Sequence, residues 1–124
     1  MKPSAPTTVV DVETHSNGKP TPRTPGTLRL VDAVIDQLEA WGVRFVYGVV
    51  GDTILPFVSA LGERDQIAFI PARHEEAAVF MAKAQAKLTG ELAVCIATSG
   101  PGAAHMVNGL ADAKTDSAAV LAIT

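Results

Sequence analysis

The sequence predicts an α/β fold in which one doubly wound parallel sheet carries helices on both faces. Short apolar runs alternate with segments of helical periodicity, and glycine or proline marks the turns between them. The run over residues 92–97 has no polar alternation, which is typical of a strand covered on both faces. The 124 residues suffice for one domain, and because 48% are hydrophobic but only 5% aromatic, aliphatic side chains must fill the core.

Composition excludes several classes of protein. A formal charge of −3 and a pI near 5.5 provide no basic surface for nucleic acid. The single cysteine, Cys95, cannot form an intrachain disulfide, and inside an apolar run it is expected to be an inert buried thiol. No stretch has the length of a membrane span or the pattern of a signal peptide, so we expect a cytoplasmic protein.

The first 26 residues are predicted to be a disordered tail, because they contain five prolines and no hydrophobic periodicity. The domain is expected over residues 27–124. Its first helix is predicted to start at Thr27, whose hydroxyl can cap the first turn, and to end at Gly42. Apolar residues at helical spacing form the inner face and acidic residues the outer face: Leu28, Val31, Ile35 and Leu38 inside, and Asp32, Asp36 and Glu39 outside.

Residues 44–50 are predicted to be a buried strand that leaves through a glycine turn. Asp52 or Thr53 can cap the second helix, where Pro56 is tolerated in the first turn. A second strand follows over residues 67–70 and ends at Pro71.

An alanine-rich helix is predicted over residues 75–88 and is closed by Gly90. The strand at residues 92–97 leads through a glycine-proline turn into a helix that passes Leu110, and residues 118–123 form a fourth apolar run. Such a final strand has no covering helix within the sequence, so we expect a sheet incomplete at its carboxyl end and a chain that is the front part of a larger protein.

Two strand-to-helix junctions carry the candidate chemistry. In a parallel sheet both junctions reach the carboxyl edge, where open α/β sheets bind ligands. Glu75 and Glu76 begin one helix, where a charged first turn is the simpler explanation and a carboxylate directed toward a pocket is the functional one. His74 is interpreted as a residue that orients the turn or as a base, and Arg73 as the partner of a carboxylate.

The second junction contains Ser99, Gly100, Pro101 and Gly102. It lacks the lysine of a phosphate-binding P-loop, but its glycines would let a flat ring approach the backbone; a turn needed for packing alone is the alternative. His105 and Asn108 lie one turn apart on the next helix and can share a face toward the site. No ligand cluster has metal-site spacing, so no metal is expected in this chain.

The motifs, in this order and at these distances, resemble the amino-terminal pyrimidine-binding domain of thiamine diphosphate enzymes. The resemblance covers about residues 27–124. It rests on Gly48-x-x-Gly51-Asp52, Arg73-His74-Glu75-Glu76-Ala77-Ala78, Lys87-Leu88-Thr89-Gly90, Ala93-Val94-Cys95, Ser99-Gly100-Pro101-Gly102, Asn108-Gly109-Leu110 and Asp112-Ala113.

Within that family, His105 and the Asn108-Gly109-Leu110 segment are most similar to the pyruvate oxidase and quinone-dependent pyruvate dehydrogenase branch. The chain departs from the family pattern at Val49-Val50, where Val-Pro is commoner. The resemblance implies that Glu75 is the catalytic glutamate that hydrogen-bonds the cofactor pyrimidine, and that Glu76 is a structural carboxylate. It also implies cofactor contacts from Gly51, Ser99, Gly100, Pro101, Gly102, His105 and Asn108.

The resemblance further implies a 2-oxo acid substrate, with pyruvate favoured, and a homo-oligomer whose active sites lie between two subunits, with a tetramer expected for the full-length parent. Magnesium and FAD are expected only through domains that these residues do not contain. Burial under the cofactor is expected to raise the pKa of Glu75. The chain alone is expected to be inactive. Two alternatives stay open: an acetolactate synthase-type carboligase, and a non-catalytic flavodoxin-like binding module.

Overall fold

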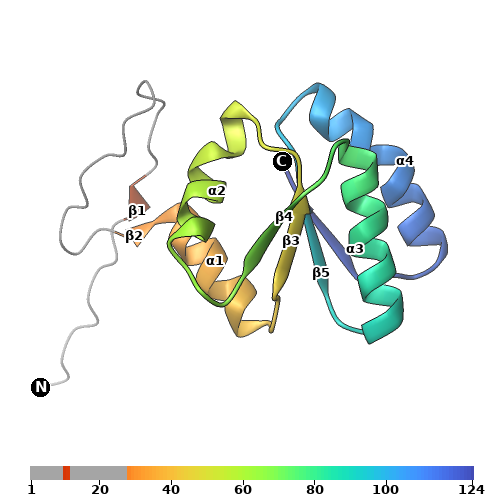
Figure 1. The fold of residues 1–124 in the computed structure, drawn as a ribbon, viewed down its shortest axis with the longest axis horizontal. Helices are drawn as coiled ribbons and strands as arrows, with labels where there is room; N and C mark the ends of the chain where they lie inside the picture. The colour runs from red at the N-terminus through yellow and green to blue at the C-terminus, as the bar shows by residue number, and fades with distance from the viewer. Residues whose placement is uncertain (1–9, 12–27) are drawn as a thin grey trace, which may run out of the picture.

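The computed structural model describes residues 10–11 and 28–124 (Figure 1). The tail predicted over residues 1–26 lies outside the described residues except for Val10–Asp11. These two residues form β1, which pairs in parallel with β2 (Leu28–Arg29).

The main sheet has four parallel strands in the order β4-β3-β5-β6. Its strands are β3 (Phe45–Gly48), β4 (Ala68–Pro71), β5 (Ala93–Ile96) and β6 (Val120–Ile123). The chain moves outward from β3 to β4 and then returns to β5 on the other side of β3, so the winding direction changes between β3 and β5. The predicted doubly wound α/β fold is therefore confirmed, and its switch point lies where ligands bind in such sheets.

Helices cover both faces of this sheet (Figure 1). One face carries α1 (Leu30–Ala40) and α2 (Leu55–Gly62), which follows the short 3-10 helix η1 (Asp52–Ile54). The other face carries α3 (Glu75–Thr89) and α4 (Pro101–Thr115), which pack closely against each other.

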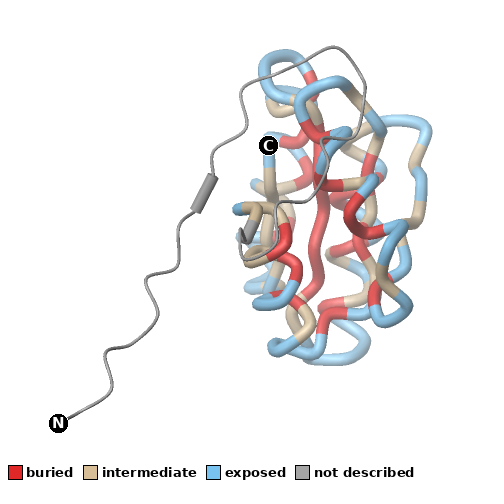
Figure 2. Tube along the Cα trace, turned by 90° about the vertical axis from the view of Figure 1, so that its left-hand side faces the viewer, coloured by how far each residue is buried: buried red, intermediate tan, exposed pale blue. Residues whose placement is uncertain are grey.

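Two apolar clusters fill the space between the sheet and its helices, and Figure 2 shows the buried residues gathered inside the exposed turns. Large side chains such as Ile35, Leu38 and Leu61 build the α1–α2 side. The α3–α4 side is built mostly from alanines with Val79 and Met106, so these helices approach the sheet closely. Strand β5 is buried along its whole length, as its uninterrupted apolar sequence predicts.

The amino-terminal end of α1 differs from the prediction. The helix begins at Leu30, and its N-cap Arg29 makes no side-chain capping hydrogen bond, so the predicted start at Thr27 is wrong. Asp32, predicted on the outer face, is buried, because its carboxylate accepts hydrogen bonds from Arg29 at 2.7 and 2.9 Å and lies 3.6 Å from Arg64. These guanidinium groups compensate the loss of hydration that burial of a charge entails.

Glycine ends the third helix as predicted, since Gly90 is the C-cap of α3 with φ 75°. The predicted cap of the second helix is wrong, because α2 begins after Ile54 without a side-chain capping hydrogen bond. Neither Asp52 nor Thr53 caps this helix. Pro56 does lie in the first turn of α2.

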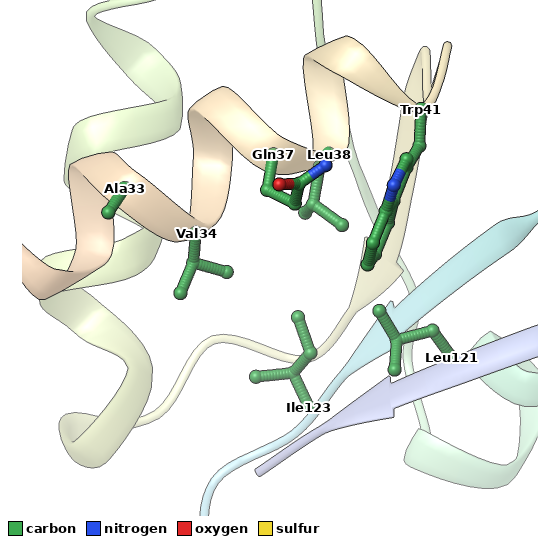
Figure 3. A pocket seen from close by; sticks show the side chains of 7 residues that line it. All are labelled: Ala33, Val34, Gln37, Leu38, Trp41, Leu121 and Ile123. Atoms are coloured by element: carbon green, nitrogen blue, oxygen red, sulfur yellow. The ribbon is translucent and has the colours of Figure 1, made fainter.

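An open apolar groove lies between α1 and the edge strand β6 (Figure 3). Its walls include Val34 and Trp41 from the helix and Leu121 and Ile123 from the strand. Within the described part of the chain, no helix is both long enough and apolar enough to cross a bilayer.

Candidate functional site

The β4–α3 and β5–α4 junctions meet at the carboxyl edge of the sheet, beside the switch point. The β4–α3 turn ends at His74, the N-cap of α3, whose Nδ1 accepts a hydrogen bond from the backbone N–H of Glu76 at 3.3 Å. The prediction that His74 orients the turn is therefore confirmed. Arg73 is exposed, and among residues 28–124 it has no carboxylate partner, so its predicted ion pair is not found.

Close packing of α3 against α4 brings the two junctions together. A Cβ on Gly109 would lie only 2.8 Å from Cβ of Val79, so this glycine sets the helix separation. Farther along α3, Lys83 donates a hydrogen bond to the carboxylate of Asp112 in α4. The same ammonium group lies 2.9 Å from the carboxylate of Asp116, the C-cap of α4. Because these contacts fix the two helices, side chains in their first turns have defined relative positions.

Glu75 lies at the centre of this arrangement. Its Oε2 is 3.0 Å from Nδ1 of His105, and its side chain is only 14% exposed, against 51% for His105. A Cβ on Gly102 would lie 3.3 Å from Oε1 of Glu75, so the carboxylate is beside the Pro101-Gly102 turn. The carboxylate therefore points toward the second junction rather than into bulk water.

The pKa of Glu75 is lowered in the chain alone, whereas the predicted rise depends on burial under the cofactor and stays a prediction. The largest cause is the hydrogen bond from its own backbone N–H, followed by the hydrogen bond with His105; desolvation acts in the opposite direction and is weaker. These hydrogen bonds therefore favour the carboxylate form of Glu75 in this structure.

The neighbouring carboxylate has a different partner. Asn108 Nδ2 donates a hydrogen bond to Oε1 of Glu76. His105 and Asn108 thus share one face of α4 as predicted, but each serves a different glutamate. Through this bond Glu76 ties the start of α3 to α4, which fits a structural carboxylate.

The other wall of the site comes from the switch-point loops after β3 and β5. Thr53 Oγ1 is 2.8 Å from Thr98 Oγ1 and accepts a hydrogen bond from Ser99 N at 3.0 Å. A Cβ on Gly51 would lie 2.7 Å from Cβ of Thr98, so glycine is needed for this close approach. The sequence did not predict the pairing of Thr53 with Thr98. The available signal was a threonine shortly after the carboxyl end of each of the strands β3 and β5.

Ser99, Gly100 and Pro101 are exposed at the edge of the sheet, and Gly102 is buried beneath them. Gly100 has φ 77° and is the N-cap of α4. These residues give the site an exposed backbone edge next to a mostly buried carboxylate. The arrangement suits a flat ring that stacks on the turn and shares a proton between a ring nitrogen and the Glu75 carboxyl group, so the residues present fit an aminopyrimidine.

The structure also places ligand atoms of His74, Glu75 and His105 within 4.8 Å of one another. The imidazole rings stack with their centroids 4.9 Å apart. The sequence predicted Glu75 and His105 at the same site but no metal there, because these residues lack the spacing of metal ligands along the chain.

Comparison with known proteins agrees with this geometry. A family model described as thiamine pyrophosphate enzyme, N-terminal TPP binding domain, matches residues 28–124. The Bacillus subtilis (strain 168) protein YdaP, named provisionally as a thiamine pyrophosphate-containing protein, is 54% identical over 92 residues. Pyruvate oxidase of Lactiplantibacillus plantarum is 50% identical over 92 residues, and acetolactate synthase isozyme 1 large subunit of Escherichia coli is 44% identical over 91.

Each of these alignments covers 73% of this chain, but the chain spans only 15–16% of the length of the relatives. The family model covers nearly all of the described residues, including both junctions and the switch-point loops. The chain therefore belongs to the thiamine pyrophosphate enzyme family and represents its N-terminal TPP binding domain.

Proposed function

We propose that this chain is the front portion of a thiamine diphosphate-dependent oxidative decarboxylase of a 2-oxo acid, with pyruvate as substrate. The observation that carries the proposal is the Glu75 carboxylate, which is held by His105 beside the Gly100-Pro101-Gly102 turn at the switch point. The pyruvate oxidase relative and the His105 and Asn108 motif support this branch of the family.

In this proposal Glu75 shares a proton with a ring nitrogen of the cofactor aminopyrimidine. His105 keeps the Glu75 carboxylate in place, and the backbone N–H of Glu75 favours the ionised form of that carboxylate. The turn at Gly100, Pro101 and Gly102 supports the ring from the side. When bound, thiamine diphosphate supplies the electron sink for loss of carbon dioxide from the 2-oxo acid.

Further parts of the active site belong to other domains in this proposal. A Gly-Asp-Gly motif, which would hold magnesium and the diphosphate, does not occur in the 124 residues. Magnesium and FAD are therefore assigned to other parts of a full-length parent, which forms a homo-oligomer in the cytoplasm. The isolated chain supplies one wall of the site and is expected to be inactive.

The second candidate is an acetolactate synthase-type carboligase, since a relative with that name is 44% identical. Both reactions use the same activation by Glu75, so the geometry of this wall does not separate them. The third candidate, a flavodoxin-like binding module without catalysis, predicts that Glu75 has no chemical role.

A chimera tests these candidates. Residues 28–124 would replace the aligned segment of the Lactiplantibacillus plantarum pyruvate oxidase, and the products formed from pyruvate would be identified by NMR. Pyruvate consumption by the chimera supports both enzyme candidates against the binding module. The product of the full-length parent, acetate or acetyl phosphate against an acetohydroxy acid, separates the proposal from the carboligase. A folded, cofactor-loaded chimera that consumes no pyruvate would contradict both. Pyruvate turnover by the isolated chain would contradict the expectation that one wall is insufficient.

A further inference from the structure

The cluster of His74, Glu75 and His105 has a composition that the cofactor role does not require. One ligand atom from each side chain lies within 4.8 Å of the other two, and no other such group of three occurs among the described residues. We propose that these three side chains form a binding site for a divalent transition-metal ion, with Zn²⁺ as the ion.

The chemistry of the donors selects the class of ion. Two imidazoles and one carboxylate form the ligand set of several zinc sites, and imidazole favours zinc, copper and nickel over magnesium and calcium, which take oxygen ligands. Three protein ligands leave the fourth position of a tetrahedral ion to water.

The three ligand atoms, which lie within 4.8 Å of one another, must come closer to bind one ion. In a tetrahedral zinc site with bonds of about 2.0–2.1 Å, ligand atoms are about 3.3–3.4 Å apart. The nitrogen of His105 is already 3.0 Å from Oε2 of Glu75. Both histidines are exposed. The Nδ1 atom of His74 accepts from the backbone N–H of Glu76, which leaves Nε2 for the ion, and the Gly109–Val79 contact holds the two helices at fixed separation.

Ion binding would affect the function proposed above. This effect is the one part of the inference that rests on the proposed function. A metal ion at this position occupies the carboxylate of Glu75, which would otherwise share a proton with the aminopyrimidine. Zinc and the cofactor therefore exclude each other, and zinc acts as a competitive inhibitor at this wall of the site.

The test follows the three histidine rings of the 124-residue chain by NMR while Zn²⁺ is added to metal-free protein at neutral pH. Isothermal titration calorimetry measures stoichiometry and affinity in the same buffer. We expect one ion per chain, with the ring signals of His74 and His105 shifted and those of His15 unchanged. Mg²⁺ at the same concentration is expected to shift none of them.

Matched variants separate ligands from bystanders. We expect His74→Gln, His105→Gln and Glu75→Gln each to weaken zinc binding by at least about tenfold, since losing even an outer-shell partner costs about 10–100-fold. His15→Gln, at a histidine outside the proposed ligand set, is expected to change it by less than about twofold. Circular dichroism would confirm that each variant keeps the wild-type fold.

Unchanged affinity in both histidine variants, or shifts confined to His15, would overturn the proposal, as would absence of binding at millimolar Zn²⁺. These measurements use neither cofactor nor substrate. Their failure therefore leaves the proposed decarboxylase intact, and an inactive chimera would leave the metal site intact.

Discussion

The Gly109–Val79 contact makes the relation between packing and site geometry testable. In Gly109→Ala, the new Cβ would lie 2.8 Å from Cβ of Val79, 3.0 Å from its Cγ1 and 3.4 Å from the backbone oxygen of Glu76. Normal carbon contacts are about 3.5–4.0 Å, so α4 must move away from α3 by roughly 1 Å. This overpacking costs about 1–3 kcal/mol, and the higher helix propensity of alanine offsets up to about 1 kcal/mol.

A matched substitution isolates the steric cost. Gly62, the last residue of α2, has open space where a Cβ would lie, with no atom within 4 Å, and its φ is not positive, so Gly62→Ala gains helix propensity without a clash. We expect urea unfolding to show Gly109→Ala less stable than Gly62→Ala by about 1–3 kcal/mol. Equal stability of the two variants would refute the assignment of Gly109 as the residue that sets the separation of α3 and α4.

Three further predictions concern pH, the core thiol and the core itself. The lowered pKa of Glu75 means that its contribution to stability is complete above the ordinary glutamate pKa of about 4.3 and is lost as pH falls through the folded-state value. The stability difference between wild type and Glu75→Gln, measured by urea unfolding, should therefore shrink as pH falls below about 5, and a constant difference would contradict this. Burial raises the pKa of Cys95 to about 12, so a thiol reagent at pH 8 should modify it only after unfolding; rapid modification of folded protein would disprove its burial. Leu38→Ala should lower the free energy of unfolding by about 2–5 kcal/mol, whereas Leu88→Ala, at an 87% exposed position, should change it by less than about 0.5 kcal/mol, and similar losses would refute the burial assignment.

Sequence patterns predicted the features that depend on local or periodic information. Continuous apolar residues predicted the fully buried strand β5, and Gly90 predicted the end of α3. The alternation of strands and helices predicted a parallel sheet, which in turn placed both junctions on one edge. Glu75, Gly102 and His105 were therefore predicted to lie together from topology alone.

Features that depend on distant partners were not predictable. Asp32 was assigned to the surface because its place in the pattern is that of an exposed acid. Its partner Arg64, 3.6 Å away, follows the end of α2 and is distant from Asp32 in the sequence. The Thr53–Thr98 hydroxyl pair joins residues 45 positions apart. The direction of the Glu75 pKa depends on whether two hydrogen bonds outweigh desolvation, and that balance requires coordinates.

The most direct test of the account compares Glu75→Gln with Glu76→Gln in the chimera with pyruvate oxidase, by measuring pyruvate-dependent turnover with cofactor in excess. Both substitutions neutralise a carboxylate at the start of α3, but only Glu75 lies beside the Gly100-Pro101-Gly102 turn. We predict that Glu75→Gln lowers kcat/KM by about 100-fold or more, as expected for loss of a group that holds a proton in the transition state, and that Glu76→Gln lowers it by less than about tenfold. Turnover within about tenfold of the parent chimera in Glu75→Gln would contradict the central role of this carboxylate.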